Sequence, residues 1–94
     1  MNRYARRADA NQPEIVAALR QAGWTVHHTH TLGQGFPDLA CGKRGVTVLV
    51  EVKRAGELLT PAEKIFHAEF KGAVVIAFSG EDAVQKCESH ITHI

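Results

Sequence analysis

The chain has 94 residues, a formal net charge of +1 at pH 7 and two cysteines. This length fits one small domain, residues 1–94, and no apolar run approaches the roughly 20 residues of a membrane span. The N-terminus lacks the apolar core of a signal peptide, and the two cysteines have the spacing of neither a metal site nor a secreted disulfide framework. We therefore expect a single cytoplasmic domain with no membrane partner.

The first ten residues are polar and carry three arginines, Arg3, Arg6 and Arg7. This composition favours a frayed chain end. The alternative is a flexible basic arm that contacts nucleic-acid phosphates, and Tyr4 among the arginines adds some weight to it.

A helix is predicted from Asn11 or Gln12 to Gly23. Proline at position 13 suits the first helical turn, and glycine suits the end of a helix. Apolar residues recur with helical spacing at Ile15, Ala18, Leu19 and Ala22. Glu14 lies in the first turn, where a carboxylate caps the helix and interacts favourably with its dipole. From the residues alone, this structural role is the favoured interpretation of Glu14.

Residues Trp24–Thr31 are predicted to form the first strand, with His28 and His30 on one face and His27 on the other. Two histidines spaced in this way can chelate a transition metal. Without a convincing third ligand they are more often ordinary strand residues, or donors near a phosphate. A zinc site is kept as an alternative, built from His27, His28, His30, Cys41 and Cys87.

The most informative stretch is the apolar run Val46–Lys53, which ends in two opposite charges. A glycine-bounded run of this kind predicts a strand buried on both faces. Glu51 and Lys53 are two residues apart and therefore project to the same face. A hairpin with its turn in residues 41–45 would bring Asp38 close to Glu51. Two carboxylates and one ammonium at one end of a sheet can hold a hard divalent cation and a phosphodiester.

The remaining elements alternate between strand and helix. Lys43 and Arg44 form the predicted hairpin tip, for which a solvated turn is favoured over a contact with DNA. After the loop Arg54–Glu57, Thr60 and Glu63 have the spacing of a capping box. We expect a helix ending near Lys71-Gly72, a strand over Ala73–Phe78 and a last helix from Ser79 to about Glu88. The predicted fold class is α/β, a mixed sheet flanked by helices in the order α-β-β-β-α-β-α.

Pro37-Asp38 with Glu51-Val52-Lys53 resembles the motif of the PD-(D/E)xK nuclease superfamily. The continuation Gly56–Pro61, a glycine turn followed by "LTP" and a helix, is similar to the VRR-NUC family, the virus-type replication and repair nucleases. The resemblance covers about residues 13–84. The chain differs from the family at Glu63, where glutamine is common. The capping box gives this glutamate a structural role, and we expect it to support the site from outside the ligand set.

The resemblance implies a restriction-endonuclease-like fold and a metal-dependent endonuclease that hydrolyses phosphodiester bonds in DNA. Asp38 and Glu51 would ligate Mg²⁺ or Mn²⁺, with the Val52 carbonyl as a further ligand and Glu14 as a third carboxylate. Lys53 would either orient the attacking water or stabilise the phosphate.

The family resemblance also implies partners. Standalone members act as homodimers on branched DNA, including four-way (Holliday) junctions, during replication and repair in bacteria or phage-infected cells. The small core of so short a chain also favours a dimer. The candidates for contact with DNA are the basic side chains of Arg3, Arg6, Arg7, Lys43, Arg44 and Arg54.

Two other functional classes compete with the nuclease. The first is a non-catalytic nucleic-acid-binding module that keeps the nuclease fold, and the complete set of charged motif positions argues against it. The second is a zinc-binding interaction domain, which metal analysis of the purified protein would distinguish.

Overall fold

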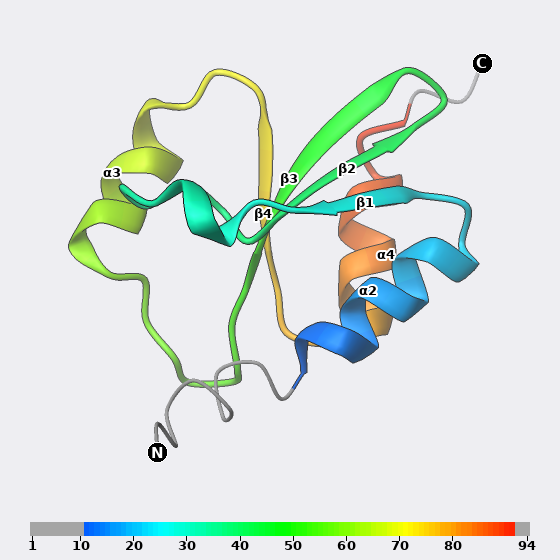
Figure 1. The fold of residues 1–94 in the computed structure, drawn as a ribbon, viewed down its shortest axis with the longest axis horizontal. Helices are drawn as coiled ribbons and strands as arrows, with labels where there is room; N and C mark the ends of the chain where they lie inside the picture. Colours follow the sequence, from blue (N-terminus) through cyan, green and yellow to red (C-terminus); the bar gives the residue numbers. More distant parts are fainter. Residues whose placement is uncertain (1–10, 92–94) are drawn as a thin grey trace.

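In the computed structural model, which describes residues 11–91, a four-stranded mixed sheet separates two helices from a third (Figure 1). In chain order the elements are α2 (Gln12–Gln21), β1 (Thr25–His28), the 3-10 helix η1 (His30–Leu32), β2 (Leu39–Lys43), β3 (Val46–Val52), α3 (Pro61–Glu69), β4 (Ala73–Ala77) and α4 (Gly80–Glu88). The predicted α/β class with a mixed sheet is confirmed. Within residues 11–91, no helix has the length and apolar character needed to cross a membrane.

The strands lie in the order β1-β2-β3-β4; the first two pairs are antiparallel and β3–β4 is parallel. The β2–β3 hairpin closes through Arg44 and Gly45, which have φ values of 53° and 81°. Two successive residues at positive φ make the tight turn that matches the twist of paired strands. Lys43 is the last residue of β2 and pairs with Val46. The prediction that Lys43 forms part of a solvated tip was therefore wrong, while Arg44 is exposed.

The core lies on the sheet face that is covered by α2 and α4 (Figure 1). Its buried members include Ile15, Leu19, Trp24, Val26, Leu39, Cys41, Val48, Val50, Val52, Ala77, Ala83 and Cys87. The two helices approach closely because α4 begins with Gly80, where a Cβ atom would lie 2.7 Å from Cβ of Ala18. Alternation along β3 sends the even-numbered side chains into this core and leaves the odd-numbered ones on the opposite face.

The first strand is shorter than the predicted Trp24–Thr31. Strand β1 ends at His28, which pairs with Leu39. The next residue, Thr29, still donates its backbone N–H to the Asp38 carbonyl at 2.8 Å and its hydroxyl to the Pro37 carbonyl at 2.8 Å. After these two bonds the chain leaves the ladder and turns into η1.

Helix α3 lies on the other side of the sheet and contributes no buried residue (Figure 1). Its start is the predicted capping box: the Thr60 hydroxyl accepts from the Glu63 N–H at 3.2 Å, and the Glu63 carboxylate accepts from the Thr60 N–H at 2.8 Å. Gly35 packs directly on this start, since a Cβ there would collide with the Ala62 backbone. The Phe36 and Phe66 rings, with centroids 5.1 Å apart, make a second attachment of α3 to the segment that precedes β2.

Candidate active site

The candidate site lies at the end of the sheet where β3 stops, on the face turned towards α3. The pairing of Leu39 with Val50 places the preceding Asp38 beside the end of β3. Oδ2 of Asp38 accepts a hydrogen bond from the Val52 N–H at 2.8 Å. The hairpin therefore brings Asp38 to the end of β3, as the sequence predicts, and a backbone donor fixes the orientation of its carboxylate.

Glu51 is the most unusual residue of the site, because its side chain is almost completely buried. The residue is 2% exposed, and Oε1 has no hydrogen-bond partner among the described residues. Burial, then the charge of Asp38 and a hydrogen bond with it, raise the pKa of Glu51 from 4.5 to about 9. Lys53 acts in the opposite direction without cancelling these effects. Burial and the adjacent Asp38 therefore favour the protonated form of Glu51 when no cation is present.

Lys53 is also buried, at 6% exposure, and faces three glutamates. Its Nζ lies 2.8 Å from Oε1 of Glu63, 3.7 Å from Oε2 of Glu57 and 3.9 Å from Oε2 of Glu51. Burial alone would lower the pKa of Lys53, but the hydrogen bond and charge of Glu63 outweigh it and raise that pKa. The ammonium is therefore charged and held in one position.

Glu63 joins α3 to the site, because the same carboxylate closes the capping box and binds Lys53. Burial would raise the pKa of Glu63, but the hydrogen bonds from Lys53 and the Thr60 N–H lower it. Glu63 thus gives Lys53 a charged partner. One turn further along α3, His67 has a buried Nε2 without a hydrogen-bond partner among the described residues. Burial lowers the pKa of His67, and Lys53 acts in the same direction while Glu63 opposes it.

The start of α2 is tied to the same end of the sheet. The Asn11 amide donates to the carbonyls of Lys53 at 3.0 Å and Phe78 at 3.2 Å, so it joins the ends of β3 and β4. Sequence reasoning did not find Asn11 or His67 as site residues. Asn11 has the signal of an ordinary helix cap, and His67 lies four residues after Glu63, a helical spacing that could have placed it on the same face.

Glu14 is exposed, and its side chain lies towards α4, with Cγ 3.7 Å from where a Cβ on Gly80 would stand. It is absent from the groups that shift the pKa of Glu51. The structure thus unites Asp38, Glu51 and Lys53 with Glu63, and gives Glu14 no contact with them. Across residues 11–91, no group of three or more His, Cys, Asp or Glu side chains is arranged to hold a metal ion.

The basic residues expected to contact DNA fall in three places. Lys43 and Arg44 are at the hairpin, at the opposite end of β3 from the site. Nζ of Lys43 is bound by the Ala22 carbonyl at 2.7 Å and by Glu88 at 2.6 Å. Arg54 is exposed and directly follows Lys53. The three remaining arginines, Arg3, Arg6 and Arg7, lie outside the described residues.

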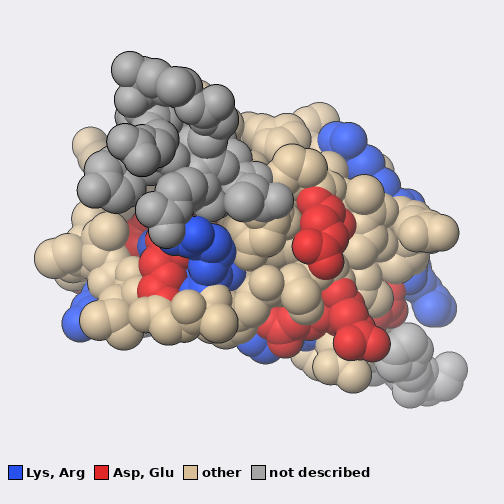
Figure 2. Space-filling model, turned by 90° about the horizontal axis from the view of Figure 1, so that it is seen from below, with Lys and Arg blue, Asp and Glu red and all other residues tan. Residues whose placement is uncertain are grey.

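Figure 2 views the molecule from the end at which β3 and β4 stop. Basic and acidic side chains lie next to one another on this surface, so the visible part carries both signs of charge. No single continuous basic face is seen on the part of this surface that the described residues form.

The residues of the zinc alternative are distributed over different environments. Cys41 and Cys87 are free thiols in the core, and burial raises their pKa values to about 11 and about 12. His27, His28 and His30 are exposed. Deeply buried neutral thiols and surface imidazoles do not form the compact tetrahedral ligand set of a structural zinc site.

The arrangement at the end of β3 has the chemistry of a cation and phosphate site. Its carboxylate oxygens are hard ligands, and one of them is buried with no hydrogen-bond partner within residues 11–91. A fixed ammonium lies beside them. Comparison of the chain with models of protein families, with curated proteins and with solved structures gave no match.

Proposed function

We propose that the chain is a divalent-metal-dependent DNA endonuclease of the VRR-NUC type, which hydrolyses phosphodiester bonds in branched DNA such as four-way junctions. One observation carries the proposal: Glu51 is buried next to Asp38, and its Oε1 has no hydrogen-bond partner among the described residues. Burial and the adjacent Asp38 raise the pKa of Glu51 to about 9. A purely structural core has no use for two adjacent carboxyl groups there, whereas a cation would offset their repulsion.

The donor set fits Mg²⁺ or Mn²⁺. Mg²⁺ is commonly held by one or two carboxylates, with water and substrate phosphate completing its shell. Asp38 and Glu51 supply those two carboxylates. In this proposal the Val52 carbonyl adds a further oxygen at the strand end, and a third carboxylate would come from Glu14 after rotation of its exposed side chain. When bound, Mg²⁺ or Mn²⁺ would lower the pKa of a coordinated water and offset charge on the phosphate.

The chain's own residues have distinct tasks in this proposal. Glu51 releases its proton when a cation binds, because the cation takes over the neutralisation of its charge. Lys53 places a positive charge next to the phosphate, where negative charge develops during hydrolysis. Glu63 acts as a positioning residue, since its 2.8 Å contact fixes the Lys53 ammonium and its capping box fixes α3. Arg54 is placed to contact the DNA backbone next to the site.

We also infer a restriction-endonuclease-like arrangement of the sheet and a homodimer. Support for the dimer comes from large apolar side chains exposed near and along α3, with Leu58 at 80%, Ile65 at 58% and Phe70 at 40%. A twofold assembly would direct two sites at two strands of a junction. Sedimentation equilibrium at micromolar concentration should give twice the chain mass, and Ile65→Lys should shift it towards the monomer. A wild-type monomer that cuts junctions symmetrically would contradict the dimer.

The proposed setting is the cytoplasm of a bacterium or of a phage-infected cell, where the two free thiols would stay reduced. Replication and repair are the processes that generate branched DNA there.

The decisive experiment incubates the protein with labelled linear, flap and four-way-junction DNA in Mg²⁺, Mn²⁺ or EDTA. We expect cuts in the branched substrates with either metal and none in EDTA. Tight binding without cleavage under every condition would favour the non-catalytic module. Stoichiometric zinc in the purified protein, with no cleavage in Mn²⁺, would favour the zinc-binding domain.

A further inference from the structure

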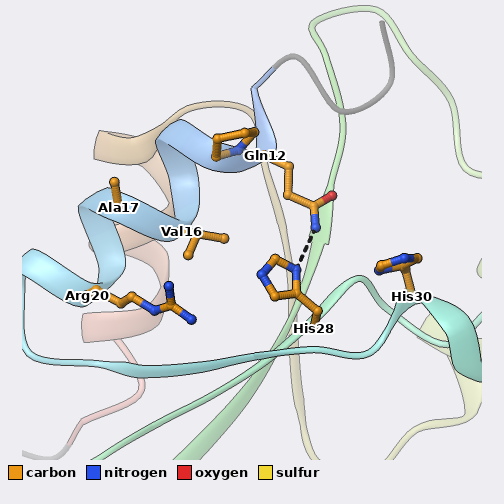
Figure 3. Close-up of a pocket in the computed structure, with 7 residues that line it drawn as sticks. Gln12, Val16, Ala17, Arg20, His28 and His30 are labelled. Atoms are coloured by element: carbon orange, nitrogen blue, oxygen red, sulfur yellow. Dashed lines mark hydrogen bonds between the residues drawn. The ribbon is translucent and has the colours of Figure 1, made fainter. Parts of the chain in front are cut away.

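A groove of about 780 Å³ runs between α2 and the end of β1 (Figure 3). One stripe of α2, from Gln12 to Arg20, forms one wall, and His28 and His30 form the other. Its volume is within the range of pockets that hold small molecules or single nucleotides. The proposed nuclease chemistry makes no use of it.

The groove combines an apolar surface with hydrogen-bond donors. Pro13, Val16 and Ala17 supply the apolar part, and none of the described residues that line the groove is acidic. The Arg20 guanidinium points into it in Figure 3. One of its nitrogens donates to the Val26 carbonyl at 3.1 Å, which fixes the side chain and leaves further N–H groups for a ligand.

The hydrogen bond between Gln12 and His28 determines what His28 offers to a ligand. Nε2 of Gln12 lies 3.2 Å from Nδ1 of His28 (Figure 3). An amide nitrogen can only donate, so Nδ1 accepts and Nε2 of the imidazole carries the proton. His28 therefore presents an oriented N–H donor. The His28 and His30 rings are also nearly perpendicular, with centroids 6.3 Å apart, so they offer aromatic surfaces in two directions.

Both walls of the groove are attached to the candidate active site. On the α2 wall, Asn11 directly precedes Gln12 and donates to the Lys53 carbonyl. On the β1 wall, Thr29 lies between the two histidines and binds the carbonyls of Pro37 and Asp38. The carboxylates lie on the other face of the sheet but at the same end of it, since His28 pairs with Leu39 and Leu39 pairs with Val50. A DNA strand that occupies both places would have to pass around this end of the sheet.

We propose that this groove is a subsite for a single-stranded segment of the DNA substrate that extends from the scissile phosphate; the assignment rests on the proposed nuclease function. Phosphate oxygens would accept from Arg20 and from Nε2 of His28. A sugar or base would lie on the apolar surface of α2 and against the histidine rings. Grooves that bind single strands combine cationic donors with aromatic or apolar surfaces in this way.

A single strand is the occupant that fits these features best. The groove has an apolar wall on α2, and Arg20 is the one Lys or Arg among the described residues that line it. A duplex, in contrast, is bound mainly through many phosphate contacts on a broad basic surface. A flap offers a single-stranded stretch next to the branch, so a subsite here would favour flaps over blunt duplexes.

The test uses the full chain and fluorescent DNA in Ca²⁺, which supports binding while cleavage is withheld. The probes are a thymidine oligonucleotide, a flap and a blunt duplex. Arg20→Ala removes a donor, and Ala17→Glu places a negative charge in the groove at an exposed helical position. Each variant has a matched control of equal charge change: Lys71→Ala, at the opposite end of the sheet, and Gln85→Glu, on the exposed surface of α4.

We expect Arg20→Ala and Ala17→Glu to bind the oligonucleotide and the flap about tenfold more weakly, with a lower salt dependence for Arg20→Ala. The two controls should stay within about twofold of wild type. His28→Gln, which keeps an N–H donor, should retain more flap affinity than His28→Leu.

Three results would overturn the subsite: groove variants that match their controls, wild type that binds no single strand, or an equal loss of affinity for the blunt duplex. These outcomes are independent of cleavage. If no metal supports cutting but the groove variants still lose single-strand affinity selectively, the nuclease proposal is wrong and the subsite is correct. If wild type cuts DNA and the groove variants bind like their controls, the nuclease proposal is supported and the subsite is wrong.

Discussion

The two ends of the β2–β3 hairpin each carry a lysine paired with a glutamate from a helix. At the turn, Nζ of Lys43 lies 2.6 Å from Glu88 of α4. At the other end, Nζ of Lys53 lies 2.8 Å from Glu63 of α3. The pairs have similar geometry, but the Lys43 side chain is 23% exposed and that of Lys53 is 7% exposed.

The difference is in the surroundings of each pair. At the turn end, the positive charge of Lys43 and the negative charge of Glu88 balance each other. Each also has a neutral hydrogen-bond partner: Lys43 donates to the Ala22 carbonyl, and Glu88 accepts from the Trp24 indole at 2.9 Å. Around Lys53, in contrast, two further glutamates lie within 4 Å, and Asp38 adjoins Glu51. The turn end is electrostatically complete, whereas the site end has an excess of acid that only protons or a cation can neutralise.

The comparison distinguishes a pair that stabilises the fold, at the turn end, from a group of charges suited to ligand binding, at the site end. Structural pairs tend to satisfy each member, while sites that bind charged ligands retain an unsatisfied group that destabilises the free protein. Removal of a single charge at the site end should therefore lower the cleavage rate strongly. Removal of a single charge at the turn end should lower only the free energy of unfolding, and only slightly.

The largest effect is expected from the carboxylates. Asp38→Asn or Glu51→Gln should lower cleavage of branched DNA in Mg²⁺ by on the order of 10³-fold or more, because each removes a charged ligand but preserves shape. The same variants should lose the rise in melting temperature that Mn²⁺ gives to the wild type. Glu88→Gln, the matched change at the turn end, should keep both. Wild-type cleavage rates in both site variants would disprove the metal assignment.

Lys53→Ala should have the next largest effect, on the rate of cleavage and not on binding. The loss of one preorganised charge beside the phosphate costs on the order of 10²–10³ in rate. Affinity for a junction in Ca²⁺ should change little, because the loss of one of several positive charges that a DNA backbone would meet changes affinity only modestly. Lys53→Arg should recover little activity, since a planar guanidinium does not replace a compact ammonium held by Glu63. Equal losses of binding and cleavage would instead make Lys53 a docking residue.

The pKa of Glu51 predicts a pH dependence of stability in the metal-free protein. Its folded-state pKa is about 9, against 4.5 for an ordinary glutamate. Between these values the folded chain binds more protons than the unfolded chain, so stability falls as pH rises through that window. Glu51→Gln, which stays neutral, should match wild type near pH 4.5 and be more stable by on the order of 3 kcal/mol at pH 7. Urea unfolding of both proteins in EDTA at several pH values measures this difference. The prediction is wrong if the free energies of unfolding of wild type and Glu51→Gln change with pH in parallel.

The sequence predicted the site through strictly local rules. The period of a strand placed Glu51 with Lys53, and a short turn placed Asp38 opposite them. The end of β1 was mispredicted because it depends on the bonds of Thr29 to Pro37 and Asp38, in the segment that precedes β2. Lys43 was mispredicted because its partner, Glu88, is 45 residues away. Asn11 and His67 were missed for the same reason: their importance comes from contacts made by other elements.

The smallest effect is expected at the turn end, where Lys43→Ala tests whether that pair is only structural. The substitution removes the bonds to Ala22 and Glu88 but leaves the Trp24 indole donating to the glutamate. Since the pair is partly solvated, we expect a loss of about 1 kcal/mol in the free energy of unfolding. Fluorescence of Trp24, the chain's one tryptophan, reports the transition in urea. Cleavage of four-way junctions should stay within about twofold of wild type, because Lys43 is remote from the carboxylates. A tenfold loss of junction affinity at unchanged stability would instead place Lys43 on the DNA-binding surface, and the two ends of the hairpin would then share one function.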